Sequence, residues 1–134
     1  MIRLAGVHEI DTIWPLLEKG MAEACRRGRG TADPYWLWTI CRRSEAMLFY
    51  VLDGQTVKAG CVCEVQNVQG ERVLKIHALC GMGSKEWLKE LSAYAANFLH
   101  VTKGVFEGRP GWGRLPGVKL VRSVYEVDLI NAGQ

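Results

Sequence analysis

Hydrophobic residues recur at three- and four-residue spacing in three parts of the chain, and each part is predicted to be an amphipathic helix. Asp11 can cap the first helix, and Asp33-Pro34 predicts the start of the second, because proline fits the first helical turn. Ser84 can cap the third helix, expected over residues 85–100. The faces predicted to be buried are Ile13, Leu16, Leu17, Met21 and Ala24 in the first helix, Trp36, Leu37, Ile40 and Cys41 in the second, and Trp87, Leu88, Leu91, Ala95 and Phe98 in the third.

Six other segments have the character of β-strands. Turn signals at Asp53-Gly54 and at residues 67–70 join the second, third and fourth of them into an antiparallel meander. The helix that follows the fourth strand should cross over and make the fifth strand parallel to it. We therefore expect one α/β (α+β) domain over residues 1–134, with a mixed sheet and helices on both faces. The predicted strands are residues 2–7, 47–52, 57–65, 72–80, 105–107 and 118–129.

Composition limits the functional classes open to this chain. Of its 134 residues 49% are hydrophobic, and the net charge of +3 is mild, so nucleic acid is not the expected partner. The longest apolar stretch, residues 46–52, is too short to cross a bilayer, and the N-terminal sequence lacks the features of a signal peptide. Five cysteines without a C-x-x-C pair and three scattered histidines predict reduced, buried thiols and no metal site. These features favour a cytoplasmic protein.

The segment from Leu74 to Leu91 carries the most specific signal. A predicted strand ends in Gly81-Met82-Gly83, and a helix follows at once. This order can place free backbone N–H groups at a helix N-terminus, where a phosphate could bind. Two glycines before a helix are also ordinary turn chemistry, so the loop alone leaves both interpretations open.

The order of these elements, with the glycine loop between the fourth strand and the third helix, resembles the GNAT (N-acetyltransferase) superfamily over essentially the whole chain. Residues 107–129, EGRPGWGRLPGVKLVRSVYEVDL, are similar to GNAT-like proteins encoded by tailed bacteriophages, and residues 13–17, IWPLL, fit the same group. The resemblance implies an acyl-CoA N-acyltransferase fold with a mixed, twisted sheet of about six strands.

It also implies a cofactor, acetyl-CoA or another acyl-CoA. In the superfamily a Gln/Arg-x-x-Gly-x-Gly/Ala loop holds the coenzyme A pyrophosphate through its amides. Gly81 and Gly83 match the small positions, but the Gln/Arg position falls on Ala78, which is a departure. Arg109 could pair with a phosphate, or could instead hold Glu107. The cofactor-binding residues implied in this way are Leu79, Cys80, Gly81, Met82, Gly83, Ser84 and Arg109.

The catalytic residues are less clearly marked. Family members often use a tyrosine after the fifth strand as general acid, but this chain has Gly111-Trp112-Gly113 there, and an indole cannot donate a proton usefully. His77 and Glu64 are the candidate bases. The structural alternatives are that His77 satisfies a neighbour and that Glu64 faces water. Cys80 has no partner base in the sequence, which argues against a nucleophile.

Two functions stay open. One is a coenzyme A-dependent N-acyltransferase that acts on a small-molecule or peptide amine in the cytoplasm of a bacterial host cell. The other is a non-catalytic GNAT-fold protein of a tailed bacteriophage, associated with the virion and bound to other virion proteins. The resemblance also implies that the domain can pair with a second copy. No membrane partner is expected.

Overall fold

The computed structural model describes residues 2–28, 32–81 and 84–106. The strands form one mixed sheet in the order β1-β2-β3-β4-β5. The first four pair antiparallel, whereas β4 and β5 pair in parallel, as predicted from the crossover helix. The predicted strand at 118–129 lies outside the described residues. The described strands are β1 (Ile2–Leu4), β2 (Met47–Asp53), β3 (Thr56–Val68), β4 (Glu71–Gly81) and β5 (Gly104–Phe106).

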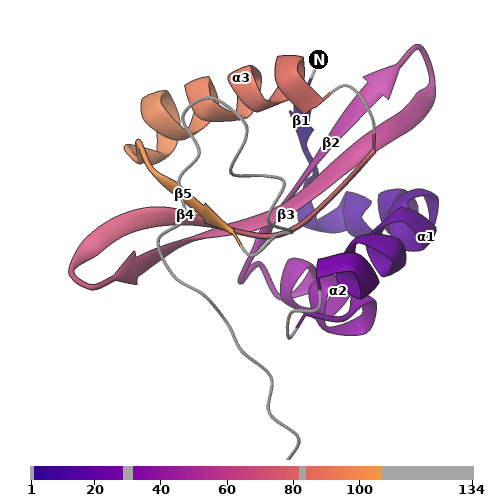
Figure 1. Ribbon diagram of the computed structural model, residues 1–134. Helices are drawn as coiled ribbons and strands as arrows, with labels where there is room; N and C mark the ends of the chain where they lie inside the picture. The colour runs from indigo at the N-terminus through magenta and orange to yellow at the C-terminus, as the bar shows by residue number, and fades with distance from the viewer. Residues whose placement is uncertain (1, 29–31, 82–83, 107–134) are drawn as a thin grey trace, which may run out of the picture.

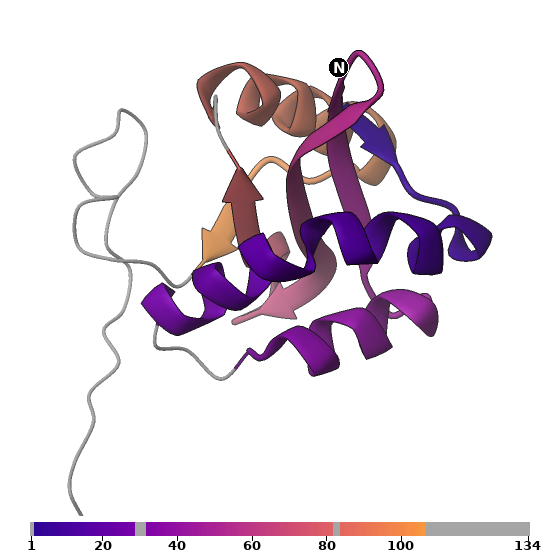
Figure 2. The ribbon, with the colours of Figure 1, turned by 90° about the vertical axis from the view of Figure 1, so that its right-hand side faces the viewer.

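Helices cover both faces of this sheet, which confirms the predicted layers. α1 (Ile10–Gly28) and α2 (Pro34–Arg42) lie on one face, and α3 (Ser84–Tyr94) lies on the other (Figures 1 and 2). A short 3-10 helix (Val7–Glu9) leads into α1, and a π-helical segment (Ala95–Leu99) continues α3. The backbone N–H of Ile2 donates to Glu90 at 2.6 Å, which joins β1 to α3.

Only one of the predicted caps of α1 and α2 is present. Asp33 caps α2 as predicted, since its Oδ1 accepts the backbone N–H of Trp36 at 3.0 Å. Asp11 lies inside the first turn of α1, because the preceding 3-10 turn starts the helical conformation earlier. Its carboxylate instead accepts the indole N–H of Trp38 at 3.0 Å and lies 3.4 Å from Arg42. Asp11 therefore joins α1 to α2.

Alternating side chains of the sheet divide the core into two clusters. Leu48, Tyr50 and Val62 pack with α1 and α2, whereas Phe49 and Cys61 pack on the α3 side. Such two-sided burial explains why β2 and the middle of β3 are almost continuously apolar. The sheet thus separates the two clusters and contributes side chains to both of them.

β4 changes its alternation part-way along. Leu74 packs on the α3 side, but Ala78 packs on the side of α1 and α2. In a regular strand these two residues, four apart, would lie on the same face. The register explains the change: consecutive residues Cys63 and Val62 face Ile76 and Ala78, so His77 is an extra residue in β4. This is a β-bulge, and it switches the face that later residues of the strand occupy.

Three residues expected on buried helical faces are instead exposed. Leu16 is 63% exposed because α1 turns Trp14 and Leu17 toward the sheet, and Trp36 is 37% exposed at the edge of α2. Phe98 is 70% exposed. The wider π-helical turn after Ala95 shifts the phase of the helix, so that Leu99 packs on the core in its place.

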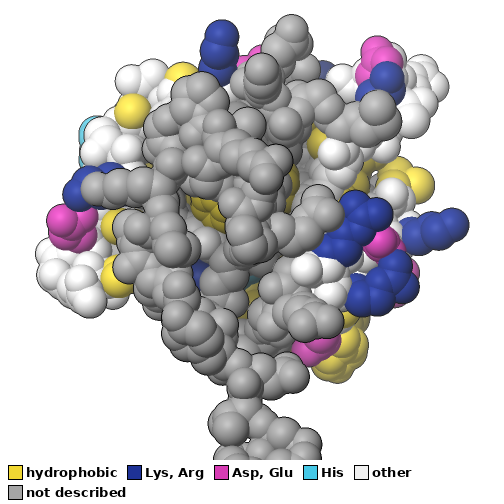
Figure 3. All heavy atoms as spheres, in the orientation of Figure 1, with side chains coloured by type: hydrophobic (Ala, Val, Ile, Leu, Met, Phe, Trp, Pro, Cys, Tyr) yellow, Lys and Arg dark blue, Asp and Glu magenta, His cyan; other side chains and the backbone are white. Residues whose placement is uncertain are grey.

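Several surface charges form ion pairs within the described residues. Arg26 and Arg27 both pair with Glu23, Lys58 pairs with Asp53, and Lys103 pairs with Glu71. Figure 3 shows Lys and Arg side chains lying among Asp and Glu side chains on the visible face. Exposed pairs of this kind add little stability, but they reduce the attraction to nucleic acid.

All five cysteines lie within the described residues as free thiols. Burial raises the pKa of Cys41 to about 12, with a further contribution from Cys63. Burial also raises the pKa of Cys25, to which the Asp33 carboxylate adds. None of the described helices is long and apolar enough to cross a membrane.

The raised thiol pKa values predict slow reaction with Ellman's reagent in the folded protein. At pH 8 only about one Cys41 side chain in ten thousand is a thiolate, and the thiolate is the reactive form. Cys41 should therefore be modified only after unfolding in urea, when all five cysteines should react. Mass spectrometry of quenched samples gives the sites. Modification of native Cys41 at the rate of a free thiol would contradict the buried position of this side chain.

Candidate active site at the end of strand β4

Among the described residues the parallel pairing of β4 with β5 covers three residues in the middle of β4. The paired residues are Leu74 with Gly104, Lys75 with Val105 and Ile76 with Phe106. Beyond Ile76, β4 continues to Gly81 while still paired with β3 on its other edge. Among the described residues no strand pairs with this later edge of β4. An extended ligand that pairs with a strand uses the backbone groups of an edge of this kind.

His77 and Glu64 meet at the point where this later edge begins. His77 is the extra residue of the bulge, and its Nε2 lies 2.7 Å from Oε1 of Glu64 on β3. The same oxygen accepts the side-chain N–H of Gln66 at 2.8 Å. The His77 side chain is 9% exposed and that of Glu64 25% exposed. The structure thus brings the two predicted base candidates together, and Glu64 does not simply face water.

The contact determines how this pair could act. An ionised carboxylate only accepts hydrogen bonds, so a neutral His77 paired with it carries its proton on Nε2. The lone pair of the ring is then on Nδ1. A carboxylate that holds one ring nitrogen and leaves the other free to accept a proton is the usual arrangement of a general base. The rings of Trp36 and His77 pack nearly perpendicular to each other with centroids 5.0 Å apart, which holds the orientation of the imidazole.

Gly81 ends β4 in a conformation that excludes a side chain. Its φ of +109° is rarely adopted by other residues, and a Cβ there would lie 2.4 Å from the carbonyl oxygen of Lys58. The glycine is therefore required by the close approach of β3 as well as by the turn. α3 begins at Ser84, so a helix follows β4 as predicted from the sequence.

The remaining predicted site residues divide into two groups. Leu79 packs on the α3 side of β4, and Cys80 packs on the side of α1 and α2. Burial raises the pKa of Cys80, partly opposed by a hydrogen bond with the backbone of Gly60, which agrees with an inert thiol. Met82, Gly83 and Arg109 lie outside the described residues.

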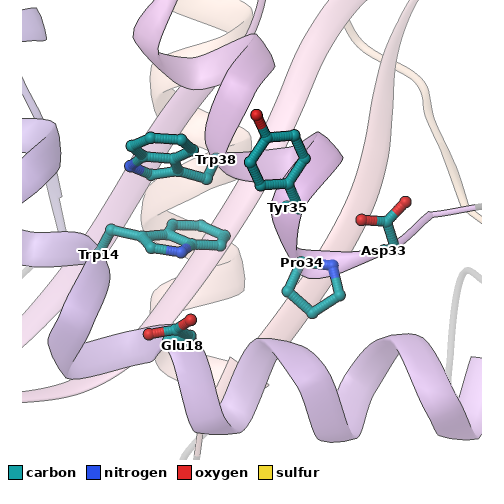
Figure 4. Close-up of a pocket in the computed structure, with 6 residues that line it drawn as sticks. All are labelled: Trp14, Glu18, Asp33, Pro34, Tyr35 and Trp38. Carbon is teal, nitrogen blue, oxygen red and sulfur yellow. The ribbon is translucent and has the colours of Figure 1, made fainter.

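A separate pocket lies between α1 and α2. Its volume is about 530 Å³, and it is lined by none of the predicted site residues (Figure 4). Its lining combines three aromatic rings, a proline and two carboxylates. The sequence spacing did not indicate this combination. The lining residues are Trp14, Glu18, Asp33, Pro34, Tyr35 and Trp38.

Comparison of the structure with solved structures gives consistent matches to acetyltransferases. A ribosomal-protein-alanine N-acetyltransferase from Brucella melitensis biovar Abortus 2308 superposes with a TM-score of 0.64 at 13% identity, over 96% of this chain and 99% of that one. The chain has the GNAT acetyltransferase fold. No protein-family model matches the sequence. A search of curated proteins also finds no match.

Two further GNAT-type neighbours have ligands in their structures. A predicted acetyltransferase from Clostridium acetobutylicum, solved with acetyl-CoA, has a TM-score of 0.61 at 12% identity and covers 100% of this chain and 99% of its own. An aminoglycoside acetyltransferase from an uncultured soil metagenomic sample, in complex with trehalose, has a TM-score of 0.63 at 9% identity, with 95% of each chain covered. At these identities the likeness shows the GNAT fold and leaves the activity to be argued from the site.

The geometry of Gly81 predicts a large effect of adding one methyl group. Gly81→Ala should lower the free energy of unfolding by about 3 kcal/mol, because unfavourable backbone geometry and overlap with Lys58 act together. Gly70→Ala is the matched control, since its φ is +81° but nothing lies within 4 Å of the new Cβ. The control should cost only about 1 kcal/mol. Urea unfolding of both variants measures the difference, and equal losses would contradict the close contact at Gly81.

Proposed function

We propose that this GNAT-fold protein is a coenzyme A-dependent N-acyltransferase that transfers an acyl group to an amine. The observation that carries the proposal is the later part of β4, which extends beyond the described pairing with β5 to Gly81, shortly before α3 begins at Ser84. In this arrangement an extended chain such as pantetheine can lie along a strand edge while a phosphate group meets the loop. The acetyl-CoA found with one structural neighbour adds support at the level of the fold.

The described residues at the end of β4 are compatible with a bound acyl-CoA. Gly81 keeps side-chain atoms away from the turn, and the adjacent N-terminus of α3 favours negative charge. We assign the pyrophosphate to the amides from Gly81 to Ser84, and the pantetheine to the edge of β4 from His77 to Leu79. Met82 and Gly83 of this loop, and Arg109 as a further phosphate ligand, belong to the proposal on sequence grounds.

An acyl-CoA would supply a thioester carbonyl that a neutral amine can attack; a C–N bond would form as the C–S bond breaks, and coenzyme A would leave as a thiolate that takes up the proton lost by the amine. The contribution of the protein is to hold the two reactants together and to accept the proton that the amine loses. His77 is suited to accept it on Nδ1, directly or through a water molecule, because Glu64 and Trp36 hold the ring in one orientation. Glu64 would stabilise the imidazolium that forms, by its hydrogen bond to Nε2.

The first test of the proposal is calorimetric titration of the protein with acetyl-CoA and with free coenzyme A. We expect dissociation constants in the micromolar range for both, since the pyrophosphate site is common to them. Gly83→Glu should abolish binding by placing a negative charge in the phosphate loop. Gly54→Glu, in the β2–β3 turn where a Cβ meets nothing within 4 Å, is the control and should leave binding intact. Absence of binding at millimolar ligand would reject the enzyme and favour the non-catalytic virion protein.

The second test separates a catalytic from a structural role of His77. With an amine identified by an acceptor screen, His77→Gln should lower kcat about a hundredfold, because an amide can donate to Glu64 but cannot accept a proton. The KM for acetyl-CoA should change little. Gln66→Leu is the control, since it removes another partner of Glu64 and leaves the imidazole in place. Equal kcat values for the two variants would assign His77 a structural role only.

A further inference from the structure

The pocket between α1 and α2 is separate from the end of β4. The helix α2 carries residues toward both places: Trp36 packs against His77, whereas Tyr35 and Trp38 line the pocket. The pocket also receives Trp14 and Glu18, which are four residues apart and therefore on the same side of α1. Any ligand here would contact neither His77 nor Glu64.

The aromatic rings surround the space from two helices. Figure 4 shows the rings of Trp14 and Trp38 one above the other, with Tyr35 and Pro34 across from them. Trp14 is 5% exposed and anchored in the core, whereas Tyr35 is 73% exposed. Rings of tryptophan and tyrosine attract cations through their electron-rich faces. Trp38 already does so within the fold, because the guanidinium of Arg42 lies 4.7 Å from its ring centroid.

Both charged residues that line the pocket are acidic. Asp33 and Glu18 contribute carboxylates, and neither forms an ion pair with any residue in the described part of the chain. The Oδ1 atom of Asp33 already accepts a hydrogen bond at the start of α2. The carboxylate of Glu18 is therefore the one more available to a ligand. Arg42 lies outside the lining and is held by Asp11, so it does not neutralise the pocket. Both residues are exposed, so their charges favour a cationic ligand over an anionic one without excluding water from the carboxylates.

We propose that this pocket binds an organic ammonium cation, whose alkyl groups contact the rings of Trp14, Tyr35 and Trp38 and whose charge is balanced by Glu18 and Asp33. The volume of about 530 Å³ is ample for a head group of this kind. Such a site goes beyond acyl transfer, since it requires neither coenzyme A nor His77. Because the pocket is open on the side of Tyr35, the expected dissociation constant is on the order of 1 mM.

The test compares choline with 3,3-dimethyl-1-butanol, a neutral molecule of nearly the same shape. Each is titrated into the 15N-labelled protein at constant ionic strength, and the indole N–H signals of the tryptophans are followed by NMR. Choline should shift the signals of Trp14 and Trp38 in a saturable way, whereas the neutral analogue should bind at least tenfold more weakly. Equal affinity for the two molecules would overturn the proposal, because it would show an apolar site without preference for charge.

Two variants identify the groups responsible. Glu18→Gln should weaken choline binding about fivefold with no change for the neutral analogue, and Glu45→Gln, another exposed carboxylate, is its matched control. Tyr35→Leu keeps an apolar side chain but removes one aromatic face, and it should weaken choline binding severalfold. Both substituted residues are exposed, so the variants should fold, which circular dichroism checks. Wild-type affinity in both variants would exclude this pocket as the cation site.

Discussion

The extra residue at His77 in β4 determines how the sheet meets its two helical layers. Before it, Leu74 and Ile76 face α3; after it, Ala78 and Cys80 face α1 and α2. If the same sequence alternated regularly without a bulge, Leu79 would face α1, where a Cβ on Gly20 would already lie 3.1 Å from the sulfur of Cys80. The bulge therefore permits the close packing of α1, and it places His77 beside Glu64 at the same time.

The described part of the parallel pairing with β5 lies next to this place in β4. From Leu74 to Ile76 the strand is paired with both neighbours, and from Ala78 to Gly81 its described pairing is with β3. A strand held firmly on one side is a rigid platform for a ligand on the other, with Gly81 shaping its end. One irregularity thus lies next to the candidate base and next to the candidate binding edge, which is where bulges are frequently found in enzymes.

The expectations from the sequence were wrong where a tertiary contact or a change of helix type outweighed the local pattern. Phe98 fitted the helical period, but the π-helical turn after Ala95 changed the phase. Asp11 was predicted to cap α1, but the helix begins before it. The carboxylate of Asp11 instead accepts a hydrogen bond from Trp38 and pairs with Arg42. Trp36 fitted the buried face of α2, but it lies at the edge, against His77. In each case the deciding contact involved residues far away in the chain or a change of helix type.

The sequence by itself determined the order of the elements, the meander, the parallel crossover and the glycine turn before α3. These depend on hydrophobic spacing and on turn chemistry within a few residues, and they sufficed for the GNAT fold. Tertiary structure alone decided that Glu64 and His77 share a hydrogen bond and that two helices enclose an aromatic, acidic pocket. Both depend on strand register and helix packing, which are set by contacts across the fold. A single extra residue in β4 shifts that register, and no local pattern in the sequence announces it.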